Sequence, residues 1–455
     1  MSDNQSHIVA IIGGGLAGCE CAWRLAGMGL DVQLFEMRPE KSTPAHVSGD
    51  LAELVCSNSL RSSERTKAVG VLKDEMASLG SLVMQAAAAT RLPAGKAFAV
   101  DRDRFAAYMT DRIESHPRIT VQRREVASLD APALEGAWRT VVAAGPLASD
   151  PLARSLHARV GRDHLSFYDA IAPIVDGASV DMDHAFFGSR YRPEDTDYLN
   201  CPLAEDEYKA LVRELVHGEK VVPREFEKQV HFEGCLPVEE MARRGEMTLA
   251  FGPLKPVGLE DPRTGKRPFA VVQLRAENEE KTAFNLVGFQ TKLTWGEQKR
   301  VFRMIPGLRN AEFLRLGSIH RNTYVDAPRV LGETLELKAA PGIHLAGQIT
   351  GVEGYVESAA CGQWLGLALG LAARGKAPAR PPVTTAMGAL LANLGREEKN
   401  FQPSNAHFGL MPALEQKAGK RRRKELYGER AGERWAEWLA GLDKADVELD
   451  IPEGA

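Results

Sequence analysis

The sequence predicts an α/β protein that starts with a dinucleotide-binding unit, and three neighbouring features predict it. Residues 13–18 hold the pattern Gly-x-Gly-x-x-Gly, directly after an apolar run at residues 8–12 that is typical of a buried strand. A helical stretch follows at residues 19–26, and residues 31–36 form a second strand-like run that ends in a carboxylate. Strand, glycine turn, helix and strand in this order make a βαβ unit of the usual length.

Each glycine in this turn has a different expected role. Gly13 allows the tight turn, Gly15 lets backbone N–H groups approach a pyrophosphate, and Gly18 lets the helix pack closely on the strand. Glu36 stands where a ribose hydroxyl would be bound. A glycine-rich turn in some other α/β protein is the alternative, but the strand, helix and acidic residue together favour cofactor binding.

The same pattern returns late in the chain. Residues 342–347 predict a strand that ends in glycine, followed by a helix that begins near Glu353. Flavoproteins commonly have Gly-Asp at this place, whereas this chain has Gly347 and Gln348, whose amide can still bond a ribityl or phosphate oxygen. Because the two parts are far apart in sequence, the flavin domain is predicted to be discontinuous.

The region between the two parts has another character. Further strands at residues 121–126 and 139–146, and a loop with a short strand at residues 92–102, continue the first part. From about residue 167 to 325, mixed strands such as 270–274 and 285–289 stand among Gly, Pro and aromatic residues without a βαβ rhythm. An inserted α+β domain is therefore expected.

The predicted fold class is thus α/β, a Rossmann-like FAD-binding domain of the glutathione-reductase-like kind, discontinuous, with an inserted α+β domain. The expected division is as follows: residues 1–165 for the first part of the FAD-binding domain, 166–328 for the inserted domain, 329–380 for the return segment, and 381–455 for a C-terminal helical and basic extension.

Composition bounds the class of protein. The chain has 455 residues, 44% of them hydrophobic and 26% charged, which is ordinary for a soluble globular protein of two or three domains. No long apolar run precedes the glycines, and the apolar stretch at residues 364–373 is too short to cross a bilayer. We expect a cytoplasmic protein without membrane contact. No second glycine fingerprint follows a strand, so a separate nicotinamide domain is not predicted.

Six cysteines are scattered along the chain without a CxxC pair or zinc-like spacing, at residues 19, 21, 56, 201, 235 and 361. Neither a metal site nor a disulfide framework is expected. Cys19, Cys21 and Cys361 lie at positions suited to packing, and Cys201 is also expected to be a core residue.

A local basic segment stands out against a formal net charge of −4. Residues 417–424 include six Lys or Arg side chains, and Arg430 and Arg434 follow. Such a segment could place cations against RNA phosphates, and a solvated helix face is the alternative.

Unusual strings spread over nearly the whole chain identify a family: residues 36–39, 43–46, 52–61, 167–175, 232–237, 251–259, 287–291, 320–323 and 347–355. On these strings the chain resembles the folate- and FAD-dependent tRNA (uracil-5-)-methyltransferase family (TrmFO family), relatives of the larger glucose-inhibited-division-type flavoproteins. The departures are minor: Cys-Glu-Cys follows the first turn, and Cys361 stands where a smaller residue is usual.

The resemblance implies an enzyme that methylates C5 of the T-loop uridine (position 54) of tRNA to 5-methyluridine. It implies 5,10-methylenetetrahydrofolate as the one-carbon donor and FAD, recharged by NADH or NADPH, as the reductant. No stable protein partner is evident from the sequence.

The chemistry agrees with these needs, because uracil C5 is a weak nucleophile until a group adds at C6, and a thiolate suits that addition. A base for the C5 proton and a hydride source are also needed. By resemblance, Cys235 is assigned as the nucleophile and Cys56 as the partner near the flavin, and the assignment could be reversed. A thiolate needs nearby positive charge, for which Arg61 and Lys255 are the candidates.

The glycine pattern and the resemblance together imply a set of cofactor-binding residues around the two glycine turns, the second strand end, the Cys56 string and the strand before residue 146: Gly13, Gly14, Gly15, Leu16, Ala17, Gly18, Glu36, Met37, Arg38, Ser57, Asn58, Ser59, Leu60, Ala144, Gly145, Gly347, Gln348, Gly351, Val352 and Tyr355. Tyr355 either stacks on the isoalloxazine or packs at the helix start. His320 and Arg321 are candidates for folate's glutamate or an RNA phosphate, or have a structural role.

Two other functions remain open at this point. A flavin-dependent oxidoreductase of small molecules would need a vicinal cysteine pair and a nicotinamide domain, which the sequence lacks. A non-catalytic flavoprotein that binds RNA would keep the glycine turn and the basic segment but would tolerate loss of Cys56 and Cys235.

Overall fold

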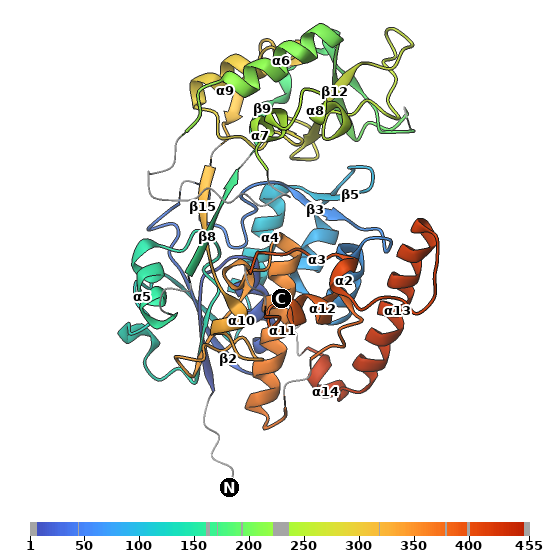
Figure 1. Cartoon of the computed structure of the whole chain (residues 1–455). Helices are drawn as coiled ribbons and strands as arrows, with labels where there is room; N and C mark the ends of the chain where they lie inside the picture. Colours follow the sequence, from blue (N-terminus) through green and yellow to red (C-terminus); the bar gives the residue numbers. More distant parts are fainter. Residues whose placement is uncertain are drawn as a thin grey trace.

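The computed structural model describes residues 7–43, 45–160, 164–170, 172–192, 194–221, 236–317, 319–377, 380–397 and 401–449. The chain forms two lobes, one above the other in Figure 1, and a pair of long strands runs between them. The lower lobe contains both ends of the described chain, and the upper lobe contains only the middle of the sequence.

A five-stranded parallel sheet organises the lower lobe. Its order is β16-β7-β1-β2-β6, and every neighbouring pair is parallel. The strands are β1 (Ile8–Ile12), β2 (Asp31–Glu36), β6 (Ile119–Arg123), β7 (Arg139–Val142) and β16 (Ile343–Leu345). The predicted α/β class is confirmed, and β16 pairs with β7 although some 200 residues separate them, which makes the sheet discontinuous in sequence as expected.

Two helices that start at the glycine turns pack against each other beside this sheet. They are α1 (Leu16–Gly27) and α11 (Tyr355–Ala373). A ridge of three glycines on α11 makes the close approach possible: a Cβ at Gly362 would lie 2.1 Å from the carbonyl oxygen of Ala17, and Gly366 and Gly370 have similarly little room. Further helices of this lobe are α2 (Ala68–Ser78), α3 (Leu82–Ala89), α4 (Arg102–Glu114), α5 (Asp150–Val160), α10 (Ala327–Val330) and α12 (Ala386–Asn393).

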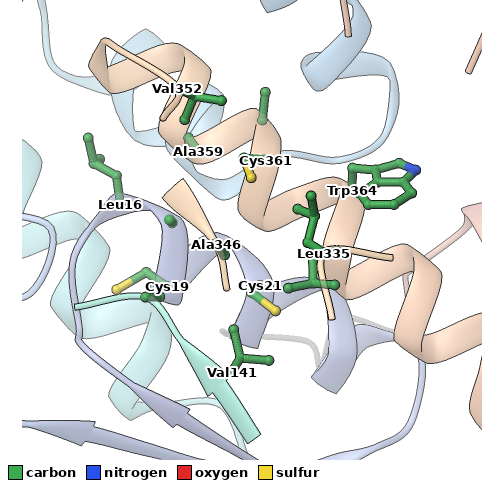
Figure 2. Packing of buried hydrophobic residues seen from close by; sticks show 14 of the residues in the cluster. Leu16, Cys19, Cys21, Val141, Leu335, Ala346, Val352, Ala359, Cys361 and Trp364 are labelled. Atoms are coloured by element: carbon green, nitrogen blue, oxygen red, sulfur yellow. The ribbon is translucent and has the colours of Figure 1, made fainter. Parts of the chain in front are cut away.

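The cysteines of these two helices are core residues, as predicted. Cys19 and Cys21 of α1 and Cys361 of α11 have no exposed surface and lie among apolar side chains such as Trp364 (Figure 2). Burial raises the pKa of all three thiols, to about 11 for Cys361. Cys201, in the upper lobe, is equally buried.

The upper lobe contains a six-stranded antiparallel sheet of order β10-β11-β12-β13-β9-β14. The strands are β9 (Ile174–Asp176), β10 (Phe186–Phe187), β11 (Tyr198–Leu203), β12 (Ala270–Ala276), β13 (Ala283–Leu286) and β14 (Phe313–Arg315), and the helices are α6 (Glu205–His217), α7 (Val238–Arg243), α8 (Thr248–Phe251) and α9 (Trp295–Phe302). The strand predicted at residues 285–289 ends earlier, because Gly288 has a φ of +80° that turns the chain.

Two smaller sheets join these parts. The strands β8 (His164–Ala170) and β15 (Ile319–Val325) pair antiparallel between the lobes, and β3 (Ser59–Ser62), β4 (Arg91–Leu92) and β5 (Ala97–Val100) form a second small sheet. Each lobe has its own cluster of buried apolar residues. The boundaries at residues 166 and 328 stay a prediction, and Tyr324, Val325 and Ala327 already belong to the cluster of the lower lobe.

The C-terminal part returns to the lower lobe. It contains α13 (Lys420–Ala440), on the right in Figure 1, and α14 (Lys444–Val447). The buried guanidinium of Arg24 on α1 donates to the carbonyl oxygens of Asp446 and Val447, and Leu449 packs on Gly27. In the described part of the chain, no helix is both long and apolar enough to cross a membrane.

Candidate functional site

A deep cleft opens at the carboxyl ends of β1, β2, β7 and β16, where ligands bind in open α/β sheets. Its volume is about 1020 Å³, counting the part open to solvent. A cleft of this size is at the upper end of the range for ligand and cofactor sites.

The first glycine turn forms one wall of the cleft, with the conformations expected from the sequence. Gly13 has a φ of +109° and donates its N–H to the carbonyl of Phe35 at 2.8 Å. A Cβ at Gly18 would lie 1.9 Å from the carbonyl oxygen of Gly13, so only glycine allows this helix–strand contact. A Cβ at Gly15 would meet nothing within 4 Å, because this position faces the cleft.

The N-terminus of α1 points its backbone toward this space. Gly15 is its N-cap residue, no side chain caps it, and its first turn has no acidic residue. Uncapped N–H groups and the positive end of the helix dipole suit a pyrophosphate. The cradle therefore fits the dinucleotide part of FAD.

Glu36, at the end of β2, is held by the protein as well as lining the cleft. Its Oε2 accepts the Gly14 N–H at 2.9 Å, and its Oε1 accepts both the N–H of Arg38 at 3.0 Å and its Nε at 2.9 Å. Burial acts to raise the pKa of Glu36, but the hydrogen bonds and charge of Arg38 outweigh it, and the pKa lies below its ordinary value. The carboxylate stays ionised as a hydrogen-bond acceptor, which is the state that ribose hydroxyls require.

Twelve of the predicted cofactor-binding residues line the cleft: Gly13, Gly15, Leu16, Ala17, Glu36, Met37, Arg38, Ala144, Gly145, Gly347, Gln348 and Tyr355. The other eight lie behind or beside it: Gly14, Gly18, Ser57, Asn58, Ser59, Leu60, Gly351 and Val352. Gly351 packs against the ring of Phe401, and Asn58 is fully buried with protein partners.

Other lining residues were not anticipated from the sequence. The segments Arg124–Val126 and Pro146–Ser149 extend the cleft, and His46, Glu53 and Ser358 also line it. The first segment directly follows β6 and the second lies shortly after the end of β7, so the position of strand ends was the signal that could have found them. Gln348, whose amide was expected to meet the cofactor, donates from Nε2 to Glu353 Oε2 at 2.7 Å.

Cys56 lies beside this cleft and contacts one of its lining side chains. The hydroxyl of Tyr355, the first residue of α11, donates to Cys56 Sγ at 3.1 Å and accepts the N–H groups of Cys56 at 2.7 Å and Ser57 at 3.2 Å. Burial and the nearby charge of Cys56 raise the pKa of Tyr355 well above its ordinary value. The phenol therefore stays protonated and remains a donor to the sulfur.

The two cations predicted to support a thiolate lie in different lobes. The guanidinium of Arg61 pairs with the fully buried Glu357 at 2.7 Å, and Lys255 is an exposed residue of the upper lobe. Arg102 of α4 and Arg275 of β12 are buried arginines that also interact electrostatically with Cys56. Sequence distance hid them, because both come from elements far from residue 56.

Some predicted residues cannot be placed. Cys235 lies outside the described residues. His320 and Arg321 belong to β15, where they pair in register with Asp169 and Tyr168, and their side chains lie outside the description. Within the described ranges, no three His, Cys, Asp or Glu side chains form a group that could hold a metal ion.

The basic segment forms the first turns of α13, and acidic residues of the same helix neutralise part of it. Arg421 pairs with Glu425 at 3.4 Å, and Arg422 binds both carboxylate oxygens of Glu429, at 2.7 and 3.0 Å. The side chain of Arg421 is nevertheless 95% exposed.

Comparison with known proteins gives a family match. The family model for glucose inhibited division protein A matches residues 8–377. A protein of Oleidesulfovibrio alaskensis named methylenetetrahydrofolate–tRNA-(uracil-5-)-methyltransferase TrmFO is 63% identical over 433 residues, which cover 95% of this chain and 97% of the relative. Proteins of the same name from Geobacter sulfurreducens and Aquifex aeolicus are 58% and 56% identical, with 95% of this chain covered in each case.

Solved structures show the same fold. The form II crystal structure of Aquifex aeolicus GidA aligns with 98% of this chain and 76% of its own chain, with a TM-score of 0.67 and 16% identity. This likeness extends over both lobes and agrees with the α/β class with a parallel sheet.

Proposed function

Because the chain belongs to the TrmFO family of methylenetetrahydrofolate–tRNA-(uracil-5-)-methyltransferases, within the glucose inhibited division protein A family, we propose that it builds a methyl group on C5 of the T-loop uridine (position 54) of tRNA. The one-carbon unit comes from 5,10-methylenetetrahydrofolate. The cofactor is FAD, held by the cleft between the Gly13–Gly15 turn and the Gly347–Gln348 turn. When bound there, FAD supplies the hydride that completes the methyl group and is recharged by NADH or NADPH.

Two thiols divide the work on the uracil ring. Cys235 adds as a thiolate to C6, which makes the ring an enolate and C5 nucleophilic toward the one-carbon unit. The Cys56 sulfur takes the proton that must then leave C5, and the bond between Cys235 and C6 breaks by elimination. In the alternative form of this mechanism, Cys56 adds to C6 and Cys235 takes the C5 proton.

Tyr355 prepares Cys56 for this role. Its hydroxyl holds the sulfur and the backbone of the Cys56 loop at once, and its raised pKa keeps the proton on the phenol. A charged acceptor strengthens such a hydrogen bond, so the contact favours the thiolate of Cys56 over the thiol.

One observation carries the proposal: a half-buried thiol lies against Tyr355, a side chain that itself lines the dinucleotide cleft. A binding module has no need of a sulfur held in this way. A small-molecule oxidoreductase would use a second, vicinal thiol, and the nearest cysteines in sequence, Cys19 and Cys21, are buried in the core.

The test is methylation of a defined tRNA. The purified protein would be incubated with a tRNA transcript, FAD, NADPH and isotope-labelled methylenetetrahydrofolate, and 5-methyluridine would be analysed by mass spectrometry. We expect label at position 54, none in a transcript with cytidine at that position, and none with Cys56→Ala or Cys235→Ala. Failure of a folded, FAD-loaded, tRNA-binding protein to incorporate label would contradict the proposal.

A further inference from the structure

The loop that carries Cys56 is held from the upper lobe by a buried arginine. Arg275 of β12 is 7% exposed, and its guanidinium donates from Nε to Asn58 Oδ1 and from Nη2 to Ser57 Oγ, both at 2.8 Å. Ser57 and Asn58 directly follow Cys56, so one side chain of the upper lobe fixes the position of the lower-lobe thiol.

Further contacts join the C-terminal end of β12 to the lower lobe. Asn58 Nδ2 donates to the carbonyl of Ala276 at 2.9 Å and to that of Val100 at 3.0 Å. Arg102 of α4 forms an ion pair with Glu277 at 2.8 Å, in which both side chains are 8% exposed, and also donates to the carbonyl of Leu54. Removal of one partner from a buried ion pair of this kind strongly destabilises the protein, because the other charge stays buried without compensation.

Buried and partly buried arginines also interact with the charge of the Cys56 sulfur. Arg102, Arg275 and Arg315 all interact with the charge of Cys56. Burial lowers the pKa of Arg275, and the negative charges of Glu277 and Cys56 act in the opposite direction. Buried guanidiniums beside a thiol favour the thiolate, because little water screens them.

We propose that Arg275 is a positioning residue for the reaction, which fixes the Cys56 loop against the upper lobe and stabilises the Cys56 thiolate, so that the reactivity of this thiol depends on contact between the two lobes. The inference rests on the proposed function for the role of Cys56 in methylation, but the contact of Arg275 with Ser57 and Asn58 stands on the geometry alone.

The experiment measures the thiol directly. In the FAD-loaded full chain carrying Cys235→Ala, iodoacetamide alkylation of the Cys56 peptide is followed by mass spectrometry from about pH 6 to pH 10. Arg275→Met should move the midpoint of the alkylation rate upward by about one pH unit, because one buried positive charge is lost. Arg275→Lys keeps a positive charge but loses the paired contacts, and should move the midpoint upward by less than Arg275→Met does.

A second readout separates positioning from loss of structure. With Cys235 intact, Arg275→Lys should lower kcat for tRNA methylation by about tenfold or more at an unchanged KM for tRNA, because an ammonium cannot hold Ser57 and Asn58 together. Ser57→Ala removes one of the two contacts of Arg275, together with the hydrogen bond from the Ser59 N–H to Ser57 Oγ at 3.1 Å, and should shift the alkylation midpoint in the same direction as Arg275→Met.

The matched control is Arg303→Met. Arg303 also makes two side-chain hydrogen bonds within the upper lobe, both to the carbonyl of Ala311, at 3.2 and 2.9 Å. Its loss should leave the alkylation midpoint unchanged. If Arg275→Met and Ser57→Ala move the midpoint no more than Arg303→Met does, the inference is overturned. A shifted midpoint in a protein that methylates no tRNA would uphold the positioning role and reject the proposed function instead.

Discussion

At the scale of single residues, Tyr355 has the most exacting position, because one hydroxyl serves three partners in the Cys56 loop. Its three contacts bring together residues 299 and 298 positions apart in the sequence. The sequence predicts Tyr355 at the cofactor but leaves its role open between stacking and packing, since a hydrogen bond over such a distance leaves no local pattern.

Tyr355→Phe tests this contact. The change keeps the ring but leaves the Cys56 and Ser57 N–H groups without their acceptor, so we expect methylation to slow by about 10- to 100-fold, as loss of a hydrogen bond to a charged group implies. FAD content should be retained. Steady-state kinetics and the flavin absorbance would be compared with those of Tyr427→Phe. Tyr427 lies on α13, and its ring stacks on Phe408. Equal rates in the two variants would remove Tyr355 from the mechanism.

Glu20 provides a residue-scale test of stability. This carboxylate is fully buried in α1 and accepts the N–H groups of Leu82 at 3.1 Å and Val83 at 2.9 Å, the start of α3. Burial raises its pKa to about 7 despite these hydrogen bonds. Between the ordinary pKa of 4.5 and about 7, the folded state therefore holds more protons than the unfolded chain, and stability must fall as the pH rises.

Glu20→Gln removes this titration. Its free energy of unfolding should fall less steeply than that of the parent from pH 5 to pH 7, by at most about 1.4 kcal/mol per pH unit. Urea unfolding at several pH values measures the slope, with Glu135→Gln at the surface as the control. Parallel slopes for the parent and Glu20→Gln would show that Glu20 does not titrate in this range.

At the scale of elements, the contact between α1 and α11 depends on glycine. In Gly362→Ala the new Cβ would lie 2.1 Å from the carbonyl oxygen of Ala17, and this backbone oxygen can move away only if α1 shifts. We expect a loss of about 1–3 kcal/mol in stability and weaker FAD retention, because both helices begin at the cofactor turns. The control is Gly432→Ala on α13, where a Cβ meets nothing within 4 Å and alanine favours the helix. Thermal unfolding and bound FAD would be measured together, and equal midpoints for the two variants would contradict this account of the packing.

The elements themselves were largely predictable from sequence. The strands β1 and β2 were placed at their observed bounds: β1 is an apolar run of five residues that ends at the glycine turn, and β2 begins shortly after Gly29 and ends in the carboxylate expected of a βαβ unit. β6 was expected at residues 121–126 and lies at Ile119–Arg123, since Arg124–Val126 leave the sheet to line the cleft. The charges around Cys56 could not be predicted, because Arg102 and Arg275 meet residue 56 only through the docking of two lobes.

At the scale of the whole molecule, the C-terminal part has a structural role that the sequence did not suggest. Arg24 depends on backbone carbonyls of residues 446 and 447, and Trp435 Nε1 donates to Ser78 at 2.7 Å. Deleting the chain after Met411 would therefore remove part of the core of the lower lobe together with the basic segment. Point substitutions are the cleaner test of RNA contact.

The expected RNA contact is tested with Arg421→Gln and Arg423→Gln combined. If the exposed start of α13 meets tRNA phosphates, affinity should fall and the slope of log K against log salt should decrease in magnitude by about 1 to 2. Filter binding at several salt concentrations measures both quantities. Arg159→Gln on α5, at the opposite edge of the lower lobe in Figure 1, is the control. An unchanged slope in the double variant would identify α13 as a solvated helix face.

In the proposed reaction, a folate one-carbon unit becomes the methyl group and its last hydride does not come from the folate. The most direct measurement uses methylenetetrahydrofolate with a ¹³C methylene and deuterium at C6 of the pterin, and determines the mass of the 5-methyluridine formed in tRNA. We expect a methyl group that carries the ¹³C and no deuterium. A methyl group with both labels would show that the folate, and not the flavin, is the reductant, and a 5-methyluridine without ¹³C would contradict the account as a whole.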